Sequence, residues 1–289
     1  MKIKASELIL NKNGSIYHLN LLPEQIAETI ITVGDPNRVE RVSRHFEKIE
    51  HKIEKREFHT QTGYYKGKRL SIVSTGIGPD NIDIVFNELD ALANIDFKTR
   101  SPKERLTKLN LIRIGTSGSI QSEIPVDSFL ISENSIGFDG VLHFYKSENI
   151  QDHDYARAFM EHLNWFEKKA SPYVVPGDQE LVAKLSSPGV FKGTTATNIG
   201  FYGPQGRVLR LALQDDSMND KIASFSYKDS KITNMEMETS TMYGLAKLLG
   251  HRSLSMNAII ANRANGTFSK DPKKVVDELI VYTLDKLVE

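Results

Sequence analysis

Three arginines stand out because the segments around them have the pattern of strands or strand ends. Arg113 interrupts the apolar run LIRIG, and Arg38 follows the corner VGDP. Arg56 lies in a segment with the pattern of a hairpin. A planar guanidinium matches two oxygens of a phosphate or a carboxylate, so these positions favour oxyanion binding. For any one arginine, a solvated side chain or an ordinary ion pair is about as common.

Arg113 is the most informative of the three. Ile112 and Ile114 flank it, and in a strand covered on both faces by helices its guanidinium needs a buried anionic partner. Thr116 follows closely and offers a hydroxyl to the same anion.

The stretch NMEMETS, residues 234–240, contains two acidic residues. We expect Glu236 and Glu238 in the first turn of a helix, where acidic side chains are stabilised by the helix dipole. At a spacing of two they do not share a helical face, which argues against a paired acid and base. A carboxylate is also a good acceptor for the two hydroxyls of a cis-diol.

The stretch FYGPQGR carries groups suited to a planar base. Phe201 is able to stack on a ring, Gln205 offers both a donor and an acceptor, and Arg207 is able to donate to a carbonyl oxygen. A surface loop rich in glycine and proline is the competing interpretation.

Glycine-rich turns resemble phosphate-binding loops only in part. Gly76 and Gly78 lack the third glycine of G-x-G-x-x-G, since Asn81 stands there, and the chain has no G-x-x-x-x-G-K-[ST]. A dinucleotide-binding oxidoreductase is therefore not supported.

Composition narrows the class of protein. The 289 residues are 39% hydrophobic, and 37 Lys and Arg balance 37 Asp and Glu, which argues against nucleic acid and anionic membranes as partners. No apolar run approaches the roughly 18 residues of a membrane helix, and the apolar stretch in MKIKASELIL is too short for a signal peptide, so we expect a cytoplasmic protein. The chain has no cysteine, and its eight histidines lack ligand spacing, so we expect no metal.

Helical and β-rich segments alternate from residue 29 onward, which predicts an α/β fold with a parallel or mixed sheet. We expect strands at 29–34, 109–115, 189–198 and 252–262, one hairpin over 53–76, and a Gly/Thr/Ser turn after residue 115. We expect helices from 36, from 79, over 237–249 and over 271–289. Residues 94–108 are a charged surface excursion.

Taken together, nine segments in order resemble the nucleoside phosphorylase-I superfamily, and more narrowly the uridine phosphorylases. They are YHL, VGDPNRVERV, KREF, STGIG, IRIGTSGSI, FDGVLHF, FYGPQGR, NMEMET and IIANR. The resemblance implies a single domain over 1–289, a three-layer α/β/α fold with a central mixed β-sheet. It also implies reversible phosphorolysis of uridine, with deoxyuridine or thymidine as further substrates, using inorganic phosphate and no cofactor.

The resemblance also assigns site residues. Phosphate would be bound by Gly34, Arg38, Arg113 and Thr116, together with Arg56 of a neighbouring subunit. Ribose would be bound by Thr116, Met237 and Glu238, together with His18 from across a dimer interface. The base would be bound by Phe201, Gln205, Arg207, Ile260 and Arg263. Arg113, Arg38 and Glu238 are the implied catalytic residues, in a homodimer or larger homo-oligomer.

Other members of the superfamily are the main alternatives. Purine nucleoside phosphorylases commonly have an aspartate after the ribose-binding helix where this chain has Asn262. A nucleosidase would not need three phosphate-binding arginines. A non-catalytic nucleoside-binding protein would not need the full set of Arg38, Arg113, Glu238, Gln205 and Arg207. The segment Gly78 to Asn81 departs from the family pattern, which puts a monovalent-cation site in doubt. The insertion at 96–108 is placed to obstruct hexamer contacts, so we expect at least a dimer and no particular larger assembly.

Overall fold

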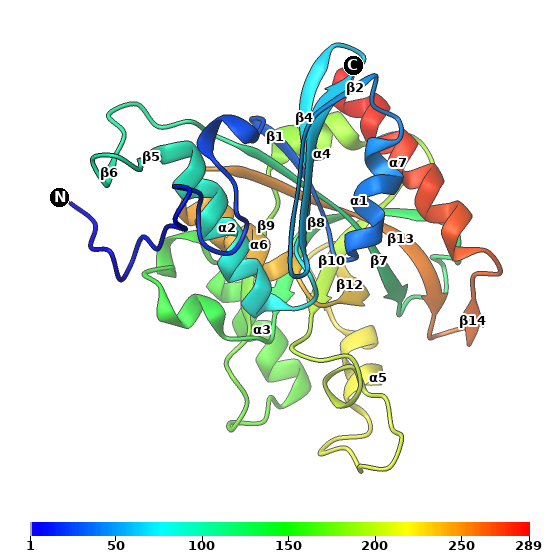
Figure 1. Ribbon diagram of the computed structural model, residues 1–289. Helices are drawn as coiled ribbons and strands as arrows, with labels where there is room; N and C mark the ends of the chain where they lie inside the picture. Colours follow the sequence, from blue (N-terminus) through cyan, green and yellow to red (C-terminus); the bar gives the residue numbers. More distant parts are fainter. Residues whose placement is uncertain (1) are drawn as a thin grey trace.

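The computed structural model describes residues 2–289 and is built around one large mixed sheet of twelve strands (Figure 1). Along its main path the order is β11-β12-β10-β8-β13-β7-β1-β4-β3-β2, with β9 beside β8 and β14 beside β13. Both parallel and antiparallel neighbours occur, for example β1 with β7 and β3 with β4. The predicted mixed-sheet α/β fold is confirmed. The long strands are β1 (Thr29–Val33), β2 (Lys48–Lys55), β3 (Phe58–Tyr65), β4 (Lys68–Ser74), β7 (Asn110–Ser119), β8 (Phe129–Gly137), β10 (Phe191–Thr197), β12 (Ser230–Glu236) and β13 (Arg252–Asn262).

Among the described residues, five short strands remain: three belong to the large sheet, and two form a separate pair in the surface segment 94–108. Residues 94–108 form a small hairpin rather than a plain loop, because β5 pairs with β6. The other short strands lie at the margins of the large sheet. Their bounds are β5 (Ile95–Asp96), β6 (Ser101–Pro102), β9 (Tyr173–Pro176), β11 (Ser226–Tyr227) and β14 (Thr267–Phe268).

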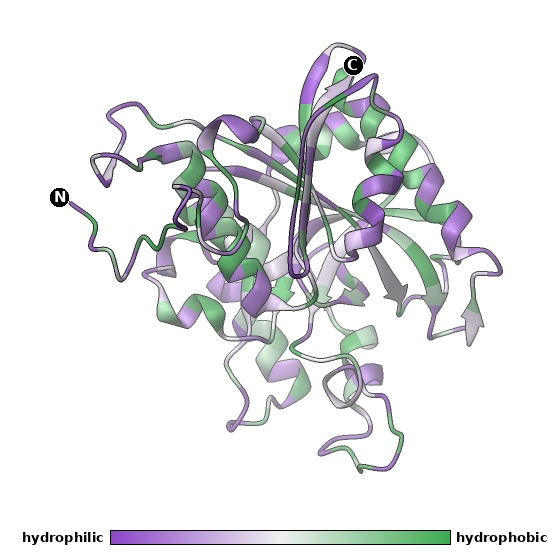
Figure 2. Ribbon diagram, viewed as in Figure 1, coloured by the Kyte–Doolittle hydropathy of each residue, from purple (hydrophilic) through white to green (hydrophobic). Residues whose placement is uncertain are grey.

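Helices cover both faces of the sheet. α1 and α4 each pack on α7 on one face, whereas α2 packs on α6 on the other, which gives the three layers expected. Figure 2 shows apolar and polar residues alternating along α2 and α7, as amphipathic helices require. The helices are α1 (Pro36–Ser43), α2 (Pro79–Asn94), α3 (His153–Leu163), α4 (Gln179–Leu185), α5 (Met218–Ser224), α6 (Thr239–Leu248) and α7 (Pro272–Val288), with 3-10 turns at Pro23–Gln25, Val141–Phe144, Glu148–Ile150 and Gly203–Gln205.

One local prediction was confirmed and extended, and another was wrong. The expected hairpin is present as β3 and β4, and β2 extends it to a three-stranded meander because the chain also turns at Arg56, whose φ is +55°. The expected turn after residue 115 is absent from the structure. Instead β7 continues to Ser119, since β13 pairs along its length and β12 pairs with its end.

The pairing of β12 with β7 closes part of the sheet into a ring. β7, β13, β8, β10 and β12 follow one another, and Asn234 on β12 then lies opposite Ser119 on β7. Because of this closure, the chain leaves β12 next to β7.

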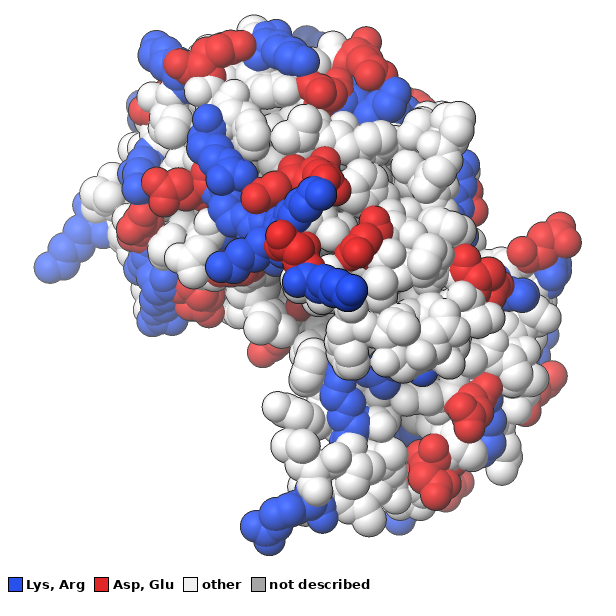
Figure 3. All heavy atoms as spheres, turned by 90° about the vertical axis from the view of Figure 1, so that its right-hand side faces the viewer, with Lys and Arg blue, Asp and Glu red and all other residues white. Residues whose placement is uncertain are grey.

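The surface has no single dominant charge. On the face shown in Figure 3, basic and acidic side chains lie side by side. Within residues 2–289, no helix is both long enough and apolar enough to cross a membrane.

Candidate active site

A buried charge cluster lies where β7 meets the start of α6. Arg113 projects from β7, where its backbone pairs with Thr32 of β1 and Ser255 of β13. Its side chain is only 6% exposed and meets two carboxylates. Arg113 Nη2 donates to Glu238 Oε2 at 2.5 Å and lies 3.3 Å from Glu236 Oε2.

The two carboxylates are close together because neither belongs to the helix. Glu236 is the last residue of β12, and Glu238 immediately precedes α6. The prediction that both lie in a helical first turn was wrong, so the helical spacing used to judge their relative orientation does not apply. Glu236 accepts hydrogen bonds from the backbone N–H groups of Glu238 and Thr239, so it caps the helix, whereas Glu238 is held by Arg113 and by the backbone N–H of Gly78 at 2.9 Å.

Burial dominates the ionisation of Glu238. It raises the pKa of the carboxyl above its ordinary value, against the lowering effect of Arg113, while the nearby Glu236 carboxylate raises it further. A neighbouring group that donates hydrogen bonds to Glu238 would therefore stabilise its charged form. The hydroxyls of a sugar are groups of this kind.

Arg38 lies beside this cluster at the first turn of α1. The turn is shaped by Asp35, whose side chain caps α1 by accepting from the backbone N–H of Asn37. Arg38 Nη1 donates to the carbonyl oxygen of Ile114 at 3.2 Å, but its Nε is buried without a partner among the described residues. Burial, together with repulsion from Arg113, lowers the pKa of Arg38 to about 10. An oxyanion bound between the two guanidinium groups would stabilise the charged form of Arg38 and so oppose both effects on its pKa.

Gly115 is a site residue that sequence reasoning missed. A Cβ at this position would overlap the guanidinium of Arg113, which folds back across the strand. Only glycine leaves that space. The signal available in the sequence was a glycine two residues after the buried arginine, which puts it on the same face of the strand.

Asn257 and Ser255 were also missed. They lie on β13 beside Arg113, whose Nη1 donates to Asn257 Oδ1 at 3.3 Å and to Ser255 Oγ at 3.5 Å. Their alternation along RSLSMNAIIAN puts them on one face, but which face could not be known before β13 was placed next to β7.

The second group of predicted residues forms around the 3-10 turn Gly203–Gln205. Gln205 is buried, and its Oε1 accepts from Arg207 Nη1 at 2.7 Å and from Arg263 Nη2 at 3.2 Å. Burial lowers the pKa of Arg263 to about 10. The structure therefore brings together the amide and two guanidinium groups expected to bind a base. It also places the Arg207 guanidinium over the ring of Phe201, 3.7 Å from its centre.

The other residues predicted for these sites lie on neighbouring segments. Gly34 directly follows β1, Thr116 is half-buried on β7, and Ile260 is half-buried on β13. Met237 is half-buried in the bend between β12 and α6. Among the described residues, none of these four forms a hydrogen bond to Arg113 or Gln205.

His18 and Arg56 stand apart from the charge cluster and near each other. His18 Nδ1 lies 2.7 Å from Glu88 Oε1 of α2, and its ring lies edge-on to Phe58, two residues after Arg56. Arg56 is exposed. Within residues 2–289, neither side chain forms a hydrogen bond or ion pair with Arg38, Arg113 or Glu238. The two residues that the resemblance assigns to a neighbouring subunit are thus connected through Phe58.

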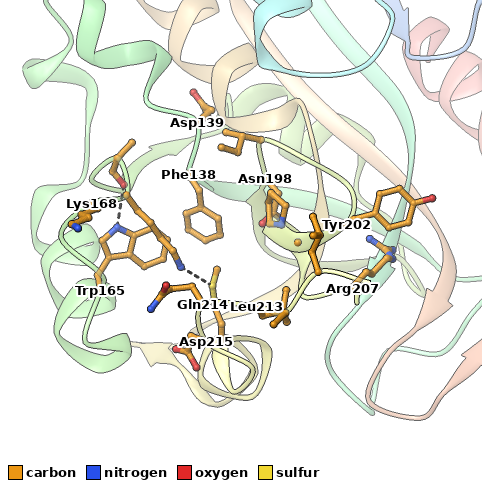
Figure 4. A pocket seen from close by; sticks show the side chains of 18 of the residues that line it. Phe138, Asp139, Trp165, Lys168, Asn198, Tyr202, Arg207, Leu213, Gln214 and Asp215 are labelled. Atoms are coloured by element: carbon orange, nitrogen blue, oxygen red, sulfur yellow. Dashed lines mark hydrogen bonds between the residues drawn. The ribbon is translucent and has the colours of Figure 1, made fainter. Parts of the chain in front are cut away.

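A cavity of about 850 Å³ adjoins the Gly203–Gln205 turn (Figure 4). Tyr202 and Arg207 line it, whereas Gln205, Arg113 and Glu238 do not. Its remaining wall comes from the ends of β8 and β10, the segment after α3 and the loop before α5. Within residues 2–289, no three histidine, aspartate or glutamate side chains are grouped so as to hold a metal ion.

Comparisons with known proteins agree with this geometry. A uridine phosphorylase of Thermococcus kodakarensis is 28% identical over 285 residues, covering 94% of this chain and 87% of its own length. A purine nucleoside phosphorylase of the DeoD type from Shewanella denitrificans is 27% identical, and the match covers 94% of this chain and 98% of that protein. The crystal structure of a Trypanosoma brucei nucleoside phosphorylase, described as showing uridine phosphorylase activity, superposes with a TM-score of 0.87 at 26% identity, covering 98% and 99%. Residues 28–286 match the model of the phosphorylase superfamily, and the chain belongs to that family.

Proposed function

We propose that this protein catalyses the reversible phosphorolysis of uridine, which yields uracil and ribose 1-phosphate. The observation that carries the proposal is the pairing of two sites: a buried Arg113–Glu238 cluster beside Arg38, and the Gln205 amide held by Arg207 and Arg263. The first suits phosphate and a ribose diol, and the second suits the edge of a pyrimidine. The named activities of the Thermococcus and Trypanosoma relatives support the same choice.

Phosphate is the nucleophile in this mechanism. Arg38 and Arg113 hold it beneath the sugar, with Gly34 and Thr116 beside it and Arg56 supplied by a second subunit. Oxygen of phosphate forms a bond to C1′ as the bond from C1′ to the base nitrogen breaks, and the electron pair leaves with uracil. Glu238 and Met237 orient the ribose, whose ring gains positive charge that phosphate stabilises.

The base site serves the other end of the breaking bond. Uracil gains negative charge as it leaves, and Arg207 and Arg263 stabilise that charge. Gln205 fixes the orientation of the ring by offering both a donor and an acceptor. For Phe201 to stack on the base, the Arg207 guanidinium must leave its present position over the ring. Ile260 borders the same site.

A purine nucleoside is a poorer fit. Asn262 is buried, and its Nδ2 donates to the carbonyl oxygens of Gln121 and Ile124 at 2.9 and 2.8 Å. The side chain is therefore engaged in holding the loop after β7. An amide also has no proton to transfer to a departing purine, whereas the base site here is rich in groups for a pyrimidine.

We further propose a cytoplasmic homo-oligomer, at least a dimer, with each site completed by His18 and Arg56 of a second subunit. The shared position of these two residues, away from the charge cluster of their own chain, supports this arrangement.

The test is uracil release from uridine by the purified protein, with and without inorganic phosphate, and with inosine in parallel. We expect release that requires phosphate and favours uridine. Release without phosphate would indicate a nucleosidase, and turnover of inosine alone would indicate a purine enzyme. No turnover of either substrate would favour a nucleoside-binding protein.

A further inference from the structure

The 850 Å³ cavity beside the base site has the size of a small-molecule site and is not used by the proposed reaction. Its walls are largely apolar and aromatic. Phe138 and Trp165 lie with ring centres 5.1 Å apart, and Tyr202, Leu213 and Met218 complete the apolar lining. Figure 4 shows Phe138, Trp165 and Leu213 around a common space, with the Tyr202 ring at its edge beside Arg207. Such walls suit a flat, aromatic ligand.

Lys169 adds an incompletely satisfied positive charge to this cavity. Its Nζ lies 4.9 Å from the centre of the Trp165 ring, and within residues 2–289 its hydrogen-bond partner is the thioether sulfur of Met218, at 3.2 Å. No carboxylate oxygen of the described residues lies within ion-pair distance of it. A thioether is a weak acceptor, so the ammonium retains capacity for an anion.

The other charges around the cavity leave it positive. Lys168, Arg207 and Arg210 also line it, against two aspartates that are already engaged. Asp139 accepts from the Tyr173 and Ser240 hydroxyls, and Asp215 pairs with Lys221 at 2.8 Å. An anionic ligand is therefore favoured over a neutral or cationic one.

Asn198 supplies a buried polar group without a partner. Its side chain lies at the cavity wall near Phe138 and Tyr202, and it is completely buried. Its Nδ2 donates to the carbonyl oxygen of Ala196, but its Oδ1 has no donor among the described residues. Because an unpaired buried acceptor costs stability, a ligand N–H or O–H at this position is favourable.

We propose that this cavity binds a small anionic aromatic compound that also carries a hydrogen-bond donor. The aromatic ring packs against the paired rings of Phe138 and Trp165, the anion lies by Lys169, and the donor faces Asn198. Arg207 lines this cavity and also donates to Gln205 of the base site, so the occupant and uridine compete for its position. That coupling rests on the proposed function, whereas binding to the cavity does not.

The test uses 8-anilinonaphthalene-1-sulfonate, which has aromatic rings, an N–H donor and a sulfonate. Trp165 is the single tryptophan of the chain, so quenching of its fluorescence reports binding. We expect saturable quenching with one molecule bound per chain. The matched neutral ligand, N-phenyl-1-naphthylamine, lacks the sulfonate and should bind at least about 10-fold more weakly, as expected for loss of a favourable charge contact. Equal affinity for the two ligands, or no saturable quenching, would overturn the proposal.

Two variants locate the bound probe. Lys169→Met keeps the length of the side chain but removes the charge, and Asn198→Ala removes the acceptor. Each should weaken binding several-fold, whereas Lys184→Met on α4, which does not line the cavity, should leave it unchanged. If all three variants bind the sulfonate with the affinity of the original protein, the probe lies elsewhere and the assignment of this cavity fails.

Kinetics separate this site from the base site. As the probe concentration rises, KM for uridine should increase and then level off at a finite factor, on the order of 10-fold, as for two coupled sites. An increase in KM without limit would show that the probe binds in the base site in direct competition with uridine. That result would overturn the proposal of a second site. If the protein does not turn over uridine, the fluorescence result still decides whether the cavity binds the probe.

Discussion

At the scale of single residues, the buried arginine and its two carboxylates decide what the protein is able to bind. Arg113 is compensated by Glu238 and Glu236, and the buried Nε of the adjacent Arg38 has no partner among residues 2–289. In the proposed reaction, phosphate supplies the missing negative charge. Replacing Arg113 should therefore harm the reaction much more than binding of the base.

We predict that Arg113→Ala lowers kcat/KM for phosphorolysis by about 100-fold or more, the factor for losing a preorganised electrostatic contact. Steady-state kinetics with varied phosphate measure this. Loss of the buried cation also leaves Glu238 and Glu236 facing each other, so Arg113→Lys serves as the control that keeps the charge but not the planar fork. Near-normal turnover of Arg113→Ala would refute the phosphate assignment.

We predict that Gln205→Ala lowers kcat/KM for uridine by about 10- to 100-fold, since a hydrogen bond to a charged or strongly polar partner contributes roughly that factor. The affinity for phosphate should stay nearly unchanged, because Gln205 does not contact Arg38 or Arg113. Measuring KM for each substrate separates the two effects. The matched control is Gln179→Ala on α4. A larger effect on phosphate than on uridine would contradict the assignment of the base site.

At the scale of elements, β7 is the strand that aligns the site, and glycine is required within it. Arg113 and Gly115 point to the same face of the strand, and the space above Gly115 is filled by the Arg113 guanidinium. Adding one methyl group there must push the guanidinium out of its position between Glu238 and Asn257.

We predict that Gly115→Ala abolishes the rise in melting temperature that phosphate produces, because the displaced guanidinium no longer binds the anion. Thermal unfolding with and without phosphate measures this. The crowding should also destabilise the fold by about 1–3 kcal/mol. Gly118→Ala is the matched control on the same strand, since a Cβ there would meet its nearest neighbour only at 3.9 Å. If Gly115→Ala keeps the phosphate response, the guanidinium is not the anion-binding group.

At the scale of the whole molecule, the question is whether one chain holds a complete site. His18 and Arg56 lie near each other through Phe58, but neither contacts the charge cluster of its own chain. A dimer in which each subunit completes the site of the other accounts for this placement.

Co-expression of Arg56→Ala and Arg113→Ala chains tests this arrangement. Each variant alone has both sites impaired, whereas a mixed dimer has one site with both substitutions and one intact site. Random assembly should restore about a quarter of the original activity. Separately purified variants, mixed without exchange of subunits, are the control. Activity that stays at the level of the single variants after co-expression would show that Arg56 acts within its own chain.

By itself the sequence determined the alternation of helices and strands, the strand end at Gly34, the start of α1 at Pro36 and the groups able to bind phosphate and a base. These follow from local periodicity and side-chain chemistry. How those groups meet depends on the fold in three dimensions. Arg113 and Glu238 are 125 positions apart, and they touch because β12 returns to pair with β7. Glu236 ends β12 and Glu238 directly precedes α6, so helical spacing does not apply to them. Long-range pairing of this kind leaves no periodic trace in a single sequence.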